Sequence, residues 1–132
     1  MVDQNMVGQK RRKKILLVED DPLLVKMYTA KFEKEGFDVI FAEDGEDGLK
    51  KALSENADIL LLDVMMPKLS GIDMLSKLRA DPKGKSIPVI VFSNLSQEEE
   101  AKKALELGAK EYLIKANLTP SQVLEKIKKY LN

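Results

Sequence analysis

Apolar residues gather in five short runs that are separated by longer amphipathic segments. Each run has the length of one strand and is rich in Val, Ile and Leu; the runs span residues 14–19, 37–42, 58–63, 87–93 and 111–115. Nearly continuous apolar runs are typical of strands that are buried on both faces of a parallel sheet. We therefore predict five strands in these segments.

The intervening segments repeat their apolar residues at the helical spacing of three and four positions. Pro22 begins the first predicted helix and Gly36 ends it. The apolar stripe of this helix consists of Leu24, Met27, Tyr28 and Phe32. We predict four further helices near residues 46–55, 72–80, 96–108 and 120–131.

Two of these helices begin with a local capping signal. Ser96 and Glu99 have the spacing of a capping box, and so do Thr119 and Gln122. In such a box, each of the two side chains accepts a hydrogen bond from the main chain of the other residue. Both pairs therefore predict where a helix starts.

Strands and helices alternate five times, which predicts a doubly wound α/β fold of the (βα)5 type. The helices would cover both faces of one five-stranded parallel sheet. Residues 13–132 are enough for one such domain and leave no room for a second. In open parallel sheets, ligands bind at the carboxyl ends of the strands.

The composition excludes several kinds of active site. The chain has no cysteine and no histidine, which excludes disulfides, thiolate metal sites and triads that contain either residue. No apolar stretch approaches the roughly 20 residues of a membrane helix, and no secretory signal is recognisable. We expect a cytoplasmic protein without membrane association.

The 22 basic and 22 acidic residues are unevenly distributed. The first 14 residues hold five basic residues and one acidic residue, so the rest of the chain is acidic. We interpret residues 1–12 as a disordered basic leader that precedes the domain. The acidic domain argues against direct binding to nucleic acid.

Polar side chains stand at the ends of four predicted strands. The first strand ends in Glu19 and Asp20, the third in Asp63, the fourth in Ser93 and the fifth in Lys115. The carboxyl ends of parallel strands meet at one edge of the sheet, so these side chains converge if the four strands are neighbours.

Such a cluster of carboxylates needs protons or a cation to limit its repulsion. Only oxygen ligands are available, which favours Mg2+ as the cation. Lys115 would add a positive charge and Ser93 a hydrogen-bond donor. Together these groups could bind a phosphoryl group and stabilise its transfer to Asp63 as an acyl phosphate.

Four segments resemble the motifs of response regulator receiver domains, the chemotaxis-type fold of two-component signalling: LLVEDDP, LLLDVMMPKLSG, VIVFSN and GAKEYLIKA. The resemblance covers about residues 13–131, with the four motifs in the family's order. It implies a flavodoxin-like sheet with the strand order 2-1-3-4-5.

The resemblance also implies a role for each polar residue at the strand ends. Asp63 would accept the phosphoryl group, while Ser93 and Lys115 would contact its oxygens. The implied ligands of Mg2+ are Glu19, acting through a water molecule, Asp20, Asp63 and the main-chain carbonyl of Met65.

The family's switch consists of a hydroxyl residue and an aromatic residue, which here would be Ser93 and Tyr112. Tyr112 would turn inward when Ser93 moves. The residues implied to flank the site are Asp21, Asn94, Pro67 and Gly71.

The chain departs from the family pattern at two positions. Ala116 follows Lys115 where the family usually has a proline with a cis bond; a cis bond without proline costs about 3–4 kcal/mol. Either the bond is trans here, or the fold sustains the strain of a cis bond. Asn94 replaces a small residue, and we hypothesise that it narrows access to the phosphoryl group. With Met65 and Leu95 as apolar neighbours, it would slow self-dephosphorylation.

These features predict a receiver that takes a phosphoryl group from a histidine kinase or a phosphotransfer protein and catalyses no other reaction. We expect no output domain after residue 132, so the signal would leave through a protein partner or continue along a phosphorelay. The signalling surface would comprise the fourth helix, the fifth strand and the fifth helix. Homodimerisation is left open.

Three other functions are weighed against this one. A Mg2+-dependent phosphatase of the haloacid dehalogenase type would need an aspartate two positions after its nucleophile, where this chain has Met65. A flavodoxin-type flavin carrier would need a phosphate loop where Glu19, Asp20 and Asp21 stand. A scaffold that works without phosphorylation would not require the complete set of polar residues.

Overall fold

A computed structural model of the chain describes residues 12–94 and 98–131. Its strands lie within the five predicted runs, and each is one or two residues shorter than its run: β1 (Lys14–Val18), β2 (Asp38–Ala42), β3 (Ile59–Leu62), β4 (Val89–Ser93) and β5 (Glu111–Ile114). Residues 1–11 of the predicted leader and Ser96 of the predicted capping box fall outside the described residues, whereas Arg12 is described and its side chain donates to the carbonyls of Gly36 and Phe37.

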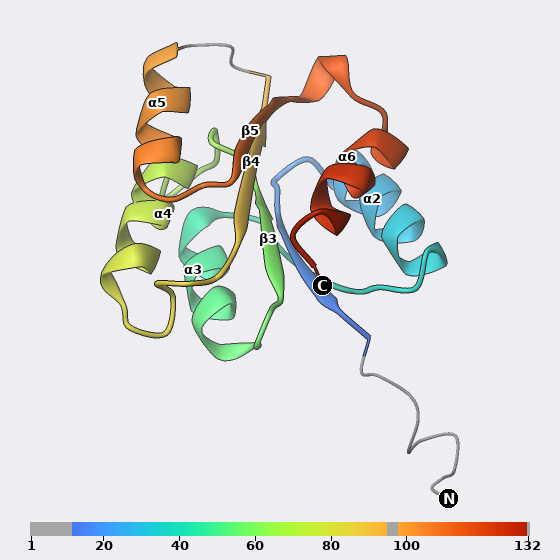
Figure 1. Cartoon of the computed structure of the whole chain (residues 1–132), viewed down its shortest axis with the longest axis horizontal. Coiled ribbons are helices and arrows are strands. Elements are labelled where there is room, and N and C mark those ends of the chain that lie inside the picture. The colour runs from blue at the N-terminus through green and yellow to red at the C-terminus, as the bar shows by residue number, and fades with distance from the viewer. Residues whose placement is uncertain (1–11, 95–97, 132) are drawn as a thin grey trace, which may run out of the picture.

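Each strand is followed by a helix, as the alternating pattern predicts. The helices are α2 (Pro22–Lys34), α3 (Gly45–Ser54), α4 (Gly71–Ala80), α5 (Glu98–Glu106), the short 3-10 helix η1 (Lys115–Asn117) and α6 (Pro120–Lys128). In Figure 1 the sheet stands between two helical layers, with α3, α4 and α5 on one face and α2 and α6 on the other. None of these helices is long and apolar enough to span a membrane.

The five strands form one parallel sheet in the order β2-β1-β3-β4-β5, which confirms the predicted topology. Val18 pairs with Leu62 and Leu62 with Val91, so β1, β3 and β4 end at nearly the same level. The order reverses between β1 and β3, and in such sheets the crevice at this reversal is the usual ligand site.

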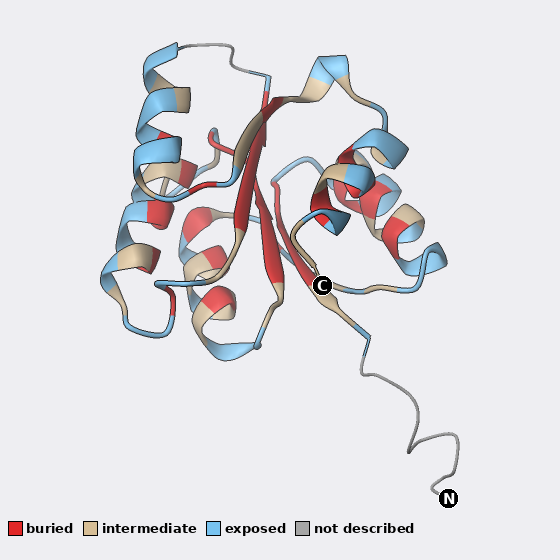
Figure 2. Ribbon diagram, viewed as in Figure 1, coloured by how far each residue is buried: buried red, intermediate tan, exposed pale blue. Residues whose placement is uncertain are grey.

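Successive side chains of the central strands point to opposite faces and fill two hydrophobic clusters. Leu16 and Val18 pack in the cluster beneath α3, α4 and α5, while Ile15 and Leu17 pack in the cluster beneath α2 and α6. Figure 2 shows the central strands as buried, together with those parts of the helices that face the sheet. The prediction of strands buried on both faces is confirmed for β1, β3 and β4.

The same prediction is wrong for β2, which is an edge strand. Its Phe41 is 44% exposed, because β1 covers only one side of β2. A related correction concerns α2, where Val25, Tyr28 and Phe32 are buried but Met27 is 43% exposed. The periodicity identified the apolar side of α2, but the position of the sheet decides which residues of that side are covered.

Local signals define the helix ends that position the site. Asp21 caps α2, with its carboxylate accepting a hydrogen bond from the main-chain N–H of Leu23 at 2.9 Å. Thr119 and Gln122 form the predicted capping box of α6. No peptide bond within the described residues is cis, so the bond between Lys115 and Ala116 is trans.

Candidate phosphoacceptor site

Three carboxylates meet at the carboxyl ends of β1 and β3. The main-chain N–H of Glu19 donates to the carbonyl of Ala42, and that of Asp63 donates to the carbonyl of Val18. The hydrogen bonds between the strands therefore extend to these two residues of the site. Glu19 is 1% exposed and Asp63 is 4% exposed, while Asp20 is exposed. The sheet therefore holds two of the three acidic residues rigidly and almost out of contact with solvent.

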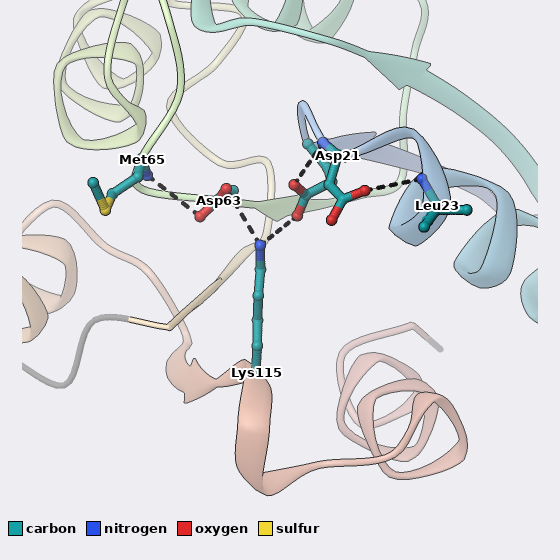
Figure 3. Close-up of polar contacts among 6 residues, drawn as sticks. Asp21, Leu23, Asp63, Met65 and Lys115 are labelled. Carbon is teal, nitrogen blue, oxygen red and sulfur yellow. Dashed lines mark hydrogen bonds and ion pairs between the residues drawn. The ribbon is translucent and has the colours of Figure 1, made fainter.

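Lys115 reaches into this cluster from the end of β5 (Figure 3). Its Nζ lies 2.5 Å from Oε1 of Glu19 and 3.3 Å from Oδ2 of Asp63. The same atom lies 4.9 Å from the centre of the Phe92 ring, which attracts the ammonium group through a cation–π interaction. Lys115 thus joins both buried carboxylates.

Main-chain N–H groups occupy the other oxygens of these carboxylates. Met65 donates to Oδ1 of Asp63 at 3.3 Å, and Asp21 donates to Oε2 of Glu19 at 3.0 Å. The Asp21 side chain turns away to cap α2 (Figure 3). Asp21 therefore lies beside the cluster without joining it, as the sequence predicts for a flanking residue.

Burial is the dominant influence on the charges of this site. It raises the pKa of Glu19 and of Asp63, although the hydrogen bond or the charge of Lys115 opposes the increase. Burial disfavours the charged form of Lys115, but its hydrogen bond to Glu19 and the charge of Asp63 outweigh this effect and raise the pKa of Lys115. The site therefore favours cations and binds protons more readily than exposed carboxylates do.

The carboxylates have the separation expected of a small-cation site. One oxygen each from Glu19, Asp20 and Asp63 lies within 4.8 Å of the others. An octahedral Mg2+ ion has ligands at about 2.0–2.1 Å and usually retains several waters. The three side chains fit such an ion if one of them binds through a water molecule. Lys115 supplies positive charge to the same carboxylates.

Ser93 and Tyr112 lie together on the neighbouring strands β4 and β5. Ser93 is 1% exposed at the end of β4, and its side chain shares a hydrogen bond with Tyr112. Burial raises the pKa of Tyr112, and this hydrogen bond opposes the increase. Asn94 follows Ser93 and is exposed. The two residues expected to form the switch are thus in direct contact.

The segment after Asp63 turns back sharply toward α4. Gly71 is buried at the start of α4, where a Cβ atom would overlap the main chain of Asp63 and Val64. Its N–H donates to the carbonyl of Val64 at 2.9 Å. Pro67 lies exposed in this turn, so both residues predicted to flank the site belong to the segment that joins Asp63 to α4.

Sequence reasoning missed two features of the site. One is the Phe92 ring, whose centre lies 4.9 Å from Nζ of Lys115. A hollow of about 630 Å3 beside Asp20 brings Met66 and Pro67 together with Glu100 of α5. The strand pattern placed Phe92 one residue before Ser93, but nothing local indicates that its ring faces Lys115.

Several known proteins have sequences similar to that of this chain. The family model described as response regulator receiver domain matches residues 15–128. PhoP, the alkaline phosphatase synthesis transcriptional regulatory protein of Bacillus subtilis, is 39% identical over 119 residues, which are 90% of this chain and 48% of PhoP. Protein PilH of Pseudomonas aeruginosa is 37% identical over 102 residues, which are 77% of this chain and 84% of PilH.

A solved structure extends the similarity to three dimensions. A chain of the CheX–CheY–BeF3–Mg2+ complex from Borrelia burgdorferi is 36% identical, with a TM-score of 0.80. The match covers 89% of this chain and 87% of that one. The present chain spans about half the length of PhoP but most of PilH and of the chain from the complex.

Proposed function

Because this chain belongs to the response regulator receiver domains, which act as phosphoacceptors in signalling, we propose that Asp63 is its phosphoacceptor. The observation that carries this assignment is the contact of Lys115 with both Glu19 and Asp63. Asp63 is the carboxylate that also receives the N–H of Met65, at the start of the loop that faces solvent.

The phosphoryl donor is a histidine kinase or a phosphotransfer protein. An oxygen of Asp63 attacks phosphorus while the nitrogen–phosphorus bond of the donor's phosphohistidine breaks. The electron pair of that bond returns to the imidazole, which leaves as a neutral ring because its other nitrogen carries a proton. Lys115 stabilises the negative charge on the phosphoryl oxygens during this transfer.

Mg2+ would be the cofactor of this reaction: Asp20, Asp63 and the main-chain carbonyl of Met65 would hold it directly, and Glu19 would do so through a water molecule. When bound, it neutralises the carboxylates and the incoming phosphoryl oxygens. The separation of the three carboxylates supports their part of the ligand set. Magnesium in the related CheX–CheY complex supports the choice of metal.

The response to phosphorylation begins at Ser93. Its hydroxyl moves to bond a phosphoryl oxygen and gives up its hydrogen bond with Tyr112, which then turns inward. This movement changes the surface formed by α5, β5 and α6, where a downstream protein binds. The same aspartyl phosphate can serve as an intermediate in a phosphorelay.

Phosphorylation by a small donor tests the proposal. Incubation with Mg2+ and acetyl phosphate should increase the mass of the protein by one phosphoryl group, and Asp63→Asn should abolish the increase. The matched control is Asp21→Asn, which removes a neighbouring carboxylate but retains a residue able to cap α2. A phosphorylated Asp63→Asn protein would disprove the assignment, and a wild type that binds Mg2+ but never gains mass would favour a scaffold.

A further inference from the structure

A groove of about 560 Å3 lies between α2 and the end of β2, beside the phosphoacceptor site, whose Glu19 also lines it. Its floor is formed mainly by apolar groups, including those of Val25, Ala30 and Phe41. Glu33 and Glu43 lie along it, and it reaches Asp20. We propose that this groove binds a segment of a partner protein that carries a bulky apolar side chain between basic residues.

The apolar part of the argument rests on Phe41. Its side chain is 44% exposed, although its ring lies at the mouth of an apolar groove. Burying apolar surface is favourable by roughly 25 cal/mol per Å2, so an exposed aromatic ring in a hollow is a strong anchor point for a partner side chain. Lys51 lies 5.7 Å from the ring centre and comes from α3, which forms no part of the groove.

Lys51 also limits the ways in which a partner can bind at this edge of the sheet. Its Nζ donates to the main-chain carbonyl of Phe41 at 2.6 Å. That carbonyl belongs to an edge strand and would otherwise be available to an added strand. Because the acceptor is occupied, the partner segment contacts the side chains of the groove instead of extending the sheet.

The charges of the groove select a basic segment. Glu33 and Glu43 are both exposed, and neither carboxylate forms an ion pair with any residue in 12–94 or 98–131. Lys26 is the one basic residue that lines the groove within the same described ranges. Acidic side chains around an apolar floor favour a cationic partner and disfavour nucleic acid or an acidic surface.

A peptide that contains tryptophan gives a direct test, because the chain itself has no tryptophan. The probe is acetyl-KLWKR-amide, titrated with the protein. Excess Mg2+ is present so that the basic peptide does not simply take the place of a cation at Asp63. We expect a blue shift of tryptophan fluorescence, with changes in the amide NMR signals of α2 and β2. The matched peptide acetyl-ELWEE-amide should not bind.

Variants locate the binding. Phe41→Ser should weaken it about tenfold, and Glu33→Gln combined with Glu43→Gln should weaken it roughly three- to tenfold. All three positions are exposed, so the variants should fold; circular dichroism checks this. The control is Leu105→Ser combined with Glu106→Gln, which alters an exposed apolar and acidic pair on α5.

No binding of the basic peptide to the wild type would overturn the proposal. It would also be overturned by unchanged binding to Phe41→Ser, by equal binding of the acidic peptide, or by NMR changes confined to α5. The groove does not depend on phosphoryl transfer, so Asp63→Asn should bind the peptide as the wild type does. A protein that fails to accept a phosphoryl group but binds the peptide would thus disprove only the proposed function.

Discussion

At the scale of single residues, Asn94 is the side chain we expect to control how long a phosphoryl group persists. It is exposed and directly follows the buried Ser93, and we hypothesise that its side chain narrows the access of water to Asp63. Asn94→Ala should therefore shorten the lifetime of the aspartyl phosphate several-fold, because a smaller side chain leaves more room for water. The measurement follows loss of phosphate from purified phosphoprotein, and an equal or longer lifetime in the variant would refute the hypothesis.

The burial of Asp63 should make the free energy of unfolding depend on pH in an unusual way. Burial raises its pKa above the ordinary value of 3.8, so the native state binds this proton more tightly than the unfolded chain does. The contribution of Asp63 to the free energy of unfolding therefore falls as the pH rises from 3.8 through the raised pKa of the native state. Asp63→Asn should be more stable than the wild type by an amount that grows over this range, with about 1.4 kcal/mol for each pKa unit.

Urea denaturation in metal-free buffer at several pH values measures this difference. Excess Mg2+ provides the control: the cation stabilises the ionised carboxylates of the wild type, so it should reduce or reverse the advantage of Asp63→Asn. A difference that stays constant with pH would show that ionisation of Asp63 does not oppose folding.

At the scale of elements, one side chain links the C-terminal end of α4 to the residues that directly follow α5. Arg79 of α4 donates to the carbonyls of Leu107 and Gly108, which follow α5, at 2.8 and 3.2 Å. It also donates to three carbonyls of the loop before β4: Gly84 at 2.8 Å, Lys85 at 3.2 Å and Ile87 at 2.8 Å. The end of α5 is therefore anchored on the side away from the phosphoacceptor site.

Arg79→Met should destabilise the protein by about 1–3 kcal/mol, because several carbonyls lose their donor at once. Hydrogen exchange should accelerate at the end of α5, and chemical denaturation gives the free energy of unfolding. Lys77→Met is the matched control, since Lys77 is a basic residue of the same last turn but is exposed. Equal losses in the two variants would show that the carbonyl contacts of Arg79 contribute little.

At the scale of the whole molecule, the proposed Mg2+ site lies at the ends of β1 and β3, so its occupation should stabilise the entire domain. A ligand that binds only the native state at 100 times its Kd adds about 2.7 kcal/mol to the free energy of unfolding. The melting temperature should therefore rise with Mg2+, and less so in Asp20→Asn. An equal rise in that variant would remove Asp20 from the ligand set, whereas Asp73→Asn, at an exposed position of α4, should behave as the wild type.

The amino-acid sequence alone predicted the elements, their order along the chain and the residues that we propose for the site. Apolar runs located the strands because a strand buried on two faces must be apolar throughout. The capping box of Thr119 and the cap of Asp21 are contacts between near neighbours in the chain, so they can be predicted locally. Glu19, Asp63 and Ser93 were predictable because they directly follow or end such strands.

Only the tertiary structure decided which distant groups touch. Lys115 and Glu19 are 96 residues apart in the chain, and their contact depends on the placement of β5 relative to β1. The exposure of Phe41 and Met27 and the five carbonyl contacts of Arg79 likewise depend on where neighbouring elements end. Periodicity records which side of an element is apolar, but the packing of elements against one another determines which atoms on that side acquire partners.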